Sequence, residues 1–310
     1  MRTTRTSCTS CVLTRASCVQ HNDAHDTHKR YWRGDEGSTT SSAAFDVGLL
    51  DDTDWRGAVW LGGGEQRQFK LHASSIVMLA GASAKIKLYV ASPGGATVKV
   101  GGKDIGDPVG VSLWADNRLS VHYFAYDLSA LLFPEAFGQP HSAAAPTNDI
   151  IVTCGGGFWA SNTSQETWGH GQDRDMQPGH PACKLLLVED SGQWPPRVVL
   201  RSGADRISGR WGPVLSDDPW RGSTIDTTLS DASAWTNASV APATPASTPS
   251  GVLFPLPAPY ARTVGSALAV SVTAVPQRPD TWLYTFPANI VGHASVKAGA
   301  ASGRGNLTLE

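Results

Sequence analysis

The chain has 310 residues, and its 25 Lys and Arg nearly balance its 27 Asp and Glu, so the formal net charge is −2. This balance gives no electrostatic basis for nucleic acid or an anionic membrane as a partner. Charged residues make up only 17% of the chain, whereas Gly (32) and Pro (20) are frequent. That composition disfavours a helical bundle. Since no apolar run approaches the roughly 18 residues of a membrane span, we expect neither nucleic acid nor membrane as a partner.

The first 45 residues differ in composition from the rest. Residues 1–22 contain three Arg and many Ser and Thr, but no acidic residue and no apolar segment of a secretory signal. An organelle transit peptide and a disordered tail both fit this segment, so no cellular location is predicted. Thiols and imidazoles that suit zinc also occur here, at Cys8, Cys11, Cys18, His21, His25 and His28. Their spacing matches no standard zinc motif. We predict a disordered or targeting tail over residues 1–45, without a metal.

From about Phe45 the chain changes to short strands separated by turns. Residues 85–90 alternate polar and apolar, Pro93-Gly94-Gly95 is a turn signal, and residues 97–100 resume the alternation. This pattern predicts a β-hairpin over residues 86–100. Further strands are predicted over residues 119–126, 149–154, 184–188 and 198–201, and one helical turn over 127–132. The sequence therefore predicts an all-β protein, with a jelly-roll-like β-sandwich over residues 46–236.

A Pro-, Ala-, Ser- and Thr-rich stretch then divides the chain. Residues 237–260 read as a linker or an extended strap. Four more strands are expected after it, over residues 267–274, 281–286, 294–297 and 306–309. We predict that residues 261–310 form part of a second β-sandwich domain.

The five Cys residues do not indicate a disulfide-stapled scaffold, because their number is odd and low for the length. Cys154 and Cys183 are far from the other three. They are either free thiols or, in an oxidising compartment, a bridged pair.

The sequence offers no catalytic motif of a common hydrolase or nucleotide-binding enzyme. Adjacent acidic residues such as Asp217 and Asp218 favour solvated turns rather than an acid–base pair. A cluster of His, Asp and Cys over residues 168–183 fits a long solvated loop better than a metal site. We expect no catalytic residue, metal or cofactor.

Tryptophans carry the binding hypothesis, because sugars stack their C–H faces on exposed aromatic rings. Trp159 and Trp168 flank a polar loop, and the alternative for both is core packing. The predicted carbohydrate-binding residues are Trp159, Asn162, Gln165, Glu166, Trp168, His170 and Asp173. Four other tryptophans are predicted to pack in the core or between domains, namely Trp55, Trp60, Trp211 and Trp235.

Six segments occur in an order that resembles the N-terminal accessory region of bacterial-type α-L-rhamnosidases. They are WRGAVWLG (55–62), GGKDIGD (101–107), YFAYDLSALL (123–132), NDIIVTCGGGFW (148–159), WGPV (211–214) and TFPANIVG (285–292). The resemblance spans residues 46–310. The turn at 101 has Gly where the family has Asn, and the last segment keeps only Phe286, Asn289 and Gly292 of its motif.

The resemblance implies an accessory region without the family's catalytic (α/α)6 barrel, which carries the acidic general acid and base. It therefore assigns no catalytic residue here. Three hypotheses follow: a carbohydrate-binding accessory module, a fragment or subunit of an active α-L-rhamnosidase completed by a barrel elsewhere, and a β-sandwich that binds another protein. The partners implied by the first two are a glycan, such as one containing rhamnose, and a catalytic barrel domain.

Overall fold

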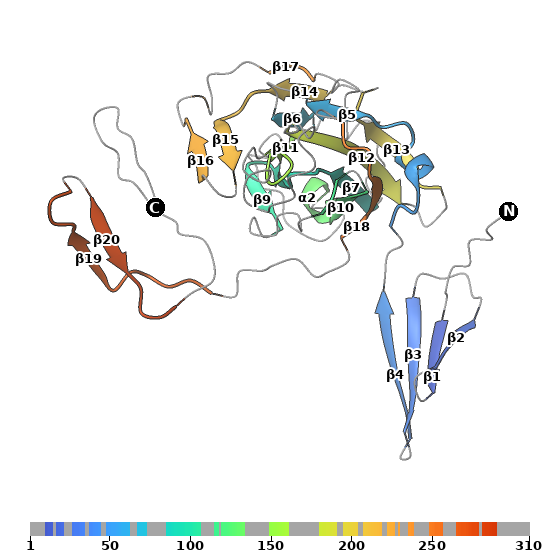
Figure 1. The fold of residues 1–310 in the computed structure, drawn as a ribbon. Coiled ribbons are helices and arrows are strands. Elements are labelled where there is room, and N and C mark those ends of the chain that lie inside the picture. The colour runs from blue at the N-terminus through green and yellow to red at the C-terminus, as the bar shows by residue number, and fades with distance from the viewer. Residues whose placement is uncertain are drawn as a thin grey trace.

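The computed structural model describes the backbone of four strands within residues 10–44 and most of residues 48–289. The latter segments are 48–62, 67–72, 85–106, 115–117, 119–133, 149–160, 180–190, 195–203, 207–218, 222–226, 229, 235–238, 248–256, 265–278 and 281–289. Most elements in these segments are strands, which confirms the predicted all-β sandwich class (Figure 1). None of the described helices is long and apolar enough to cross a membrane.

One sheet of the sandwich, called the covered sheet below, has six strands, five of them in the order β13-β12-β7-β10-β18. Their bounds are β13 Arg197–Arg201, β12 Ala182–Asp190, β7 Lys85–Ala91, β10 Ser120–Asp127 and β18 Val252–Pro255. Neighbours are antiparallel except β10 and β18, which are parallel. A short strand, β5 (Trp60–Gly62), also pairs with β12. Because β18 belongs to this sheet, part of the predicted linker is an extended segment paired with the sandwich.

The second sheet, called the exposed sheet below, is antiparallel in the order β17-β14-β6-β11-β8-β9. Its strands are β17 Thr236–Asn237, β14 Ile207–Arg210, β6 Gln68–Leu71, β11 Ile150–Cys154, β8 Ala96–Val100 and β9 Lys103–Ile105. Burial alternates along β6, β11 and β14, as a strand with one face in a core requires.

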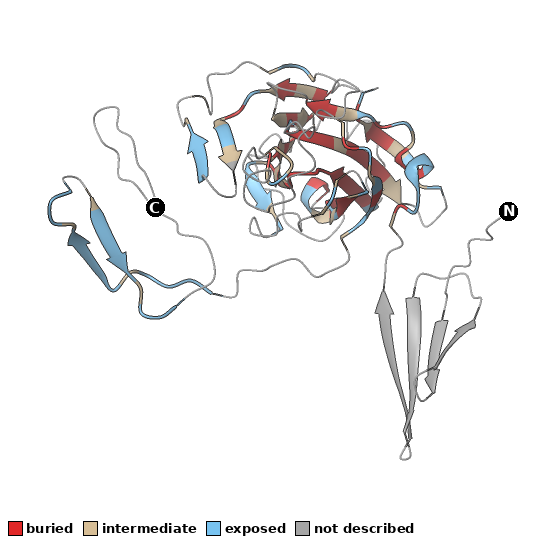
Figure 2. Ribbon diagram, in the orientation of Figure 1, coloured by how far each residue is buried: buried red, intermediate tan, exposed pale blue. Residues whose placement is uncertain are grey.

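The inner faces of the two sheets meet in one apolar core (Figure 2). The exposed sheet contributes Phe69, Leu71, Ile150 and Val152, all fully buried. Burying each such side chain contributes about 1.5–3 kcal/mol. The covered sheet contributes residues of the same kind, including Ile86, Leu88, Val90, Leu185 and Leu187.

The outer face of the covered sheet is also buried, beneath residues 49–60. The 3-10 helix η1 (Asp52–Trp55) begins at Asp51, whose carboxylate accepts a 2.9 Å hydrogen bond from Thr53 N. It places the Trp55 ring edge-on to Tyr123, with centroids 5.7 Å apart. Lys184 Nζ lies 5.3 Å from the same ring, and burial lowers the pKa of Lys184, an effect that nearby Asp52 opposes.

The predicted hairpin over residues 86–100 is wrong, although both of its strands exist. β7 pairs with β10 and β12 in the covered sheet, whereas β8 pairs with β9 and β11 in the exposed sheet. The Pro93-Gly94-Gly95 turn therefore passes from one sheet to the other. The local sequence pattern shows that the chain turns at this point. It does not show which strands pair with each other, because that depends on whether a strand buries one face or both. Burial along β7 is nearly continuous, and β8 has one half-exposed face.

The predicted helical turn is confirmed as α2 (Ser129–Leu132). Asp127 Oδ1 accepts hydrogen bonds from Ser129 N at 2.9 Å and Ser129 Oγ at 2.5 Å. Ser129 Oγ in turn accepts from Ile86 N at 2.9 Å, which ties the turn to the start of β7.

Three smaller sheets complete the described chain. β1 (Ser10–Thr14), β2 (Ser17–His21), β3 (Thr27–Gly34) and β4 (Gly37–Ala44) form a sheet in the order β2-β1-β3-β4. These strands lie where the sequence predicts a tail. Two hairpins follow, β15 (Val214–Asp218) with β16 (Gly222–Ile225), and β19 (Ser271–Ala274) with β20 (Trp282–Thr285). The predicted strands over 294–297 and 306–309 lie outside the described residues. The domain division and the jelly-roll connections stay predictions.

Candidate functional site

Of the seven predicted carbohydrate-binding residues, the structure describes Trp159. The other six lie outside the described residues: Asn162, Gln165, Glu166, Trp168, His170 and Asp173. Trp159 is half-buried, and its Nε1 donates a 3.0 Å hydrogen bond to the carbonyl of His180. This bond joins the two ends of the segment between β11 and β12. It fixes one edge of the indole ring and closes the base of the predicted binding loop.

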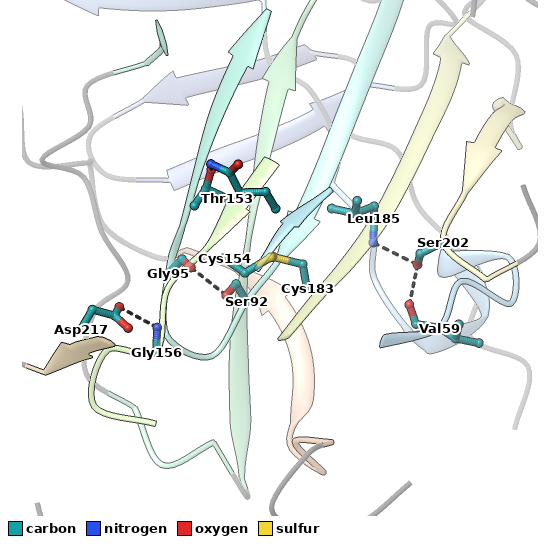
Figure 3. The surroundings of a disulfide bond; sticks show 11 residues. Val59, Ser92, Gly95, Thr153, Cys154, Gly156, Cys183, Leu185, Ser202 and Asp217 are labelled. Carbon is teal, nitrogen blue, oxygen red and sulfur yellow. Dashed lines mark hydrogen bonds between the residues drawn. A yellow bond between two sulfur atoms is a disulfide. The ribbon is translucent and has the colours of Figure 1, made fainter. Parts of the chain in front are cut away.

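A disulfide between Cys154 and Cys183 lies beside this base (Figure 3). Cys154 is the last residue of β11 in the exposed sheet, and Cys183 lies near the start of β12 in the covered sheet. Both are buried, at 1% and 0% exposure. Of the two alternatives left open by the sequence, the structure has the bridged pair. The bond links the two sheets where the loop leaves them.

Two glycine-rich turns meet at the same end of the sandwich. Gly155 N donates a 2.8 Å hydrogen bond to the carbonyl of Gly95. A Cβ on Gly94 would lie 2.3 Å from the carbonyl oxygens of Gly155 and Gly156, and Gly157 has φ +47°. Only glycine permits this approach of the two backbones. The glycine triplet therefore brings its turn onto the Pro93-Gly94-Gly95 turn.

Asp217 on β15 holds the glycine turn in place (Figure 3). Its carboxylate accepts hydrogen bonds from Gly156 N at 2.7 Å and Gly157 N at 3.3 Å. Arg67 Nη1 lies 2.9 Å from the same carboxylate, and Arg67 Nη2 donates to the Leu215 carbonyl at 3.1 Å. Both ionic side chains are largely buried, so the interpretation of Asp217 as part of a solvated turn is wrong. Three donors occupy the carboxylate, which suits it to positioning backbone rather than to acid–base chemistry.

This arrangement presents aromatic side chains on a rigid base. Phe158, 37% exposed, and Trp159 follow directly on the glycine turn that Asp217 and Gly95 hold. Aromatic surface next to backbone polar groups is what a sugar ring needs for stacking and orientation. Among the described residues, no group of three or more His, Cys, Asp or Glu could hold a metal ion.

The other tryptophans divide between core and surface. Trp55 is buried, at 1% exposure, and Trp60 packs against the same cluster, as predicted. Trp235 is half-buried beside Lys70 and Arg210. Trp211 is 40% exposed, so the core prediction is wrong for this residue. β14 ends one residue before Trp211, so the alternation of buried and half-exposed residues along this strand does not extend to Trp211.

Sequence reasoning missed Arg67 and Asp217 as parts of this site. They are 150 residues apart and meet only because β15 returns past the start of β6. The glycine triplet after an apolar strand was the available signal, since it marks a close backbone approach.

No protein-family model and no curated protein matches the sequence. Two solved structures share the fold. The α-L-rhamnosidase from Dictyoglumus thermophilum gives a TM-score of 0.55 at 18% identity, over 79% of this chain and 27% of its own. The native α-L-rhamnosidase from Aspergillus terreus gives 0.54 at 18% identity, over 77% of this chain and 27% of its own. The predicted resemblance is confirmed for the fold, and the chain spans about a quarter of the length of these structures.

Proposed function

We propose that this chain is a carbohydrate-binding accessory module, similar to a non-catalytic part of an α-L-rhamnosidase. The observation that carries the proposal is the fold shared with about a quarter of two such enzymes. The sugar ligand is then a rhamnose-containing glycan, and a catalytic barrel domain is the partner that the module supports.

The loop base around Trp159 is the proposed binding site. The indole N–H is already bonded to His180, so the ring is fixed before a ligand arrives. Stacking and burial on one such ring contribute on the order of 1 kcal/mol. Hydroxyl desolvation offsets part of this gain, so binding is weak, about millimolar to tens of micromolar. The proposed contacts from the loop are Asn162, Gln165, Glu166, Trp168, His170 and Asp173.

A calorimetric titration with L-rhamnose and methyl α-L-rhamnoside tests the proposal. Trp159→Ala should weaken binding about fivefold or more. Trp282→Ala on β20, where the ring is 54% exposed, is the matched control and should bind like the parent chain. Thermal melts of both variants separate a lost contact from a lost fold. Unchanged affinity in folded Trp159→Ala would contradict this site.

The second candidate function is a fragment or subunit of an active α-L-rhamnosidase, which the names of the two structural neighbours favour. In that case residues 1–310 supply binding and another chain or segment supplies the carboxylates. We expect no hydrolysis of aryl α-L-rhamnosides by residues 1–310 alone. Turnover that disappears in Asp173→Asn would overturn this expectation.

The third hypothesis, a protein-interaction module, is favoured by the β19–β20 hairpin. Paired residues of antiparallel strands share a face, so Val272 and Tyr284 lie together, as do Ala274 and Trp282. Val272, Trp282 and Tyr284 are each exposed. A glycan array distinguishes the first hypothesis from this one.

A further inference from the structure

The outer face of the exposed sheet carries a continuous row of side chains across five strand positions. Arg210 is paired with Gln68, Gln68 with Thr153, and Thr153 with Thr97. Thr236 is paired with Gly209 in antiparallel strands, so the preceding residue, Trp235, lies opposite the following one, Arg210. Paired residues of antiparallel strands point to the same face. The row Trp235, Arg210, Gln68, Thr153 and Thr97 therefore lies on one face, opposite the core.

Hydrogen bonds and a ring contact fix this row. Arg210 Nε donates to Gln68 Oε1 at 2.8 Å, and Gln68 Nε2 donates to Thr153 Oγ1 at 3.1 Å. The Trp235 ring centroid lies 4.3 Å from Arg210 Cζ and 4.6 Å from Lys70 Nζ. A carboxamide has two N–H groups and two acceptor lone pairs, so Gln68 keeps one of each beyond these bonds. The row is preorganised and still able to bind hydroxyl groups.

The chain after β14 passes directly against the row. Gly212 has φ +85°, and a Cβ there would come within 2.8 Å of Gln68 Cγ, so the chain after β14 passes directly against Gln68. Trp211 precedes this contact and is 40% exposed. One aromatic ring, that of Trp235, is therefore in contact with a row of amide, guanidinium and hydroxyl groups, and an exposed tryptophan precedes the segment that packs on Gln68.

Both lysines of this face lie near carboxylates, and Arg210 donates to Gln68 and lies over the Trp235 ring. Lys70 lies 3.8 Å from Asp149, and Lys99 lies 3.3 Å from Asp104. A nucleic acid would need uncompensated cations, and the centre of a protein interface is typically apolar. A row of fixed polar groups with the Trp235 ring at one end instead suits a neutral chain of hydroxylated rings.

We propose that this face is an extended binding surface for a neutral oligosaccharide that runs across the strands, in addition to the site at Trp159. The proposal rests on the proposed carbohydrate function. Four steps between neighbouring strands span about 19 Å, which exceeds the width of a single pyranose ring several times. The surface should therefore discriminate oligosaccharides from monosaccharides, whereas one tryptophan at a loop should not.

Titration of the full chain with α-L-rhamno-oligosaccharides of increasing length, from the monosaccharide to the pentasaccharide, tests this. We expect at least a tenfold gain in affinity with length. Trp235→Ala and Thr153→Val should remove that gain without changing monosaccharide affinity. Thr153→Val keeps the branched shape on the strand and replaces the hydroxyl with a methyl group, and a thermal melt of each variant checks that it is folded. Trp282→Ala should behave like the parent chain.

The outcomes separate this proposal from the proposed function. Affinity that is independent of length, or a gain with length that survives both Trp235→Ala and Thr153→Val, overturns the extended surface. If Trp159→Ala still weakens monosaccharide binding in that case, the proposed function stands. If the chain binds neither the monosaccharide nor any oligosaccharide, both proposals fail together.

Discussion

The two sheets of the sandwich differ in what their outer faces do. The covered sheet is buried on both sides, by the common core and by the segment that carries Trp55. The exposed sheet is buried on one side, and its other side holds a half-exposed row around Gln68. The covered sheet therefore has no outer face open to a ligand, whereas the exposed sheet keeps one half-exposed polar face, where the extended binding surface is proposed.

Tryptophan substitutions should show the largest difference between the outer sides of the two sheets. Trp55→Ala should destabilise the chain by about 3–5 kcal/mol, because it leaves a large cavity above the covered sheet. Trp211→Ala, beside the exposed sheet, should change stability by less than about 0.5 kcal/mol, as for ordinary surface substitutions. Urea unfolding followed by circular dichroism measures both. Equal losses would show that the two outer faces are packed alike.

The sequence predicts strand positions better than it predicts partners. β10, β11, β12 and β13 all lie where the sequence predicts strands. The apolar run in β11 nevertheless suggests burial on both faces, while the structure leaves Ile151 half-exposed. The pattern also predicts the β7 and β8 strands, but it is wrong in pairing them with each other. Periodicity reports how many faces of a strand are buried, but a turn signal does not report which sheet the chain enters next.

The next largest effect should come from the bond that joins the two sheets. Cys154 and Cys183 are 29 residues apart, and closing a loop of this length stabilises a fold by about 3.5 kcal/mol in the chain-entropy model. The unfolding free energy of the double variant Cys154→Ala, Cys183→Ala should therefore be lower by about that amount, so the variant should unfold at a lower urea concentration. The parent chain should lose the same stability in reductant, and the double variant should be insensitive to it. A double variant that still loses stability in reductant would assign the effect to another disulfide.

The candidate site was only partly predictable. The sequence indicates Trp159 because it flanks a polar loop, and in the structure it is half-buried and bonded to His180 at the base of that loop. The Arg67–Asp217 pair and the row around Gln68 have no local signal, because their members come from strands far apart in sequence. Trp235 and Trp211 resemble core residues by type, and only the register shows that Trp235 lies on the outer face.

The smallest expected effect is the pH dependence of stability that His122 causes, which depends on how well water is excluded from the edge of the covered sheet. His122 on β10 is 8% exposed and lies edge-on to Phe254 of the parallel strand β18, with ring centroids 5.1 Å apart. Burial lowers the pKa of His122 below its usual value, because the apolar surroundings disfavour the imidazolium.

Since the unfolded chain keeps a His pKa of about 6.5, it binds the proton first as the pH falls. Stability should thus be complete above about pH 6.5 and should decrease as the pH falls from there towards the lower pKa of the folded state. His122→Phe keeps an aromatic ring against Phe254 and removes the titrating group, so its unfolding free energy should decrease less over the same range. The loss should be smaller than in the two preceding cases, since neither a cavity nor a covalent bond is involved. Urea unfolding at pH 7.5, 6.5 and 5.5 for both proteins measures the difference, and parallel pH profiles would mean that water reaches this edge of the sheet.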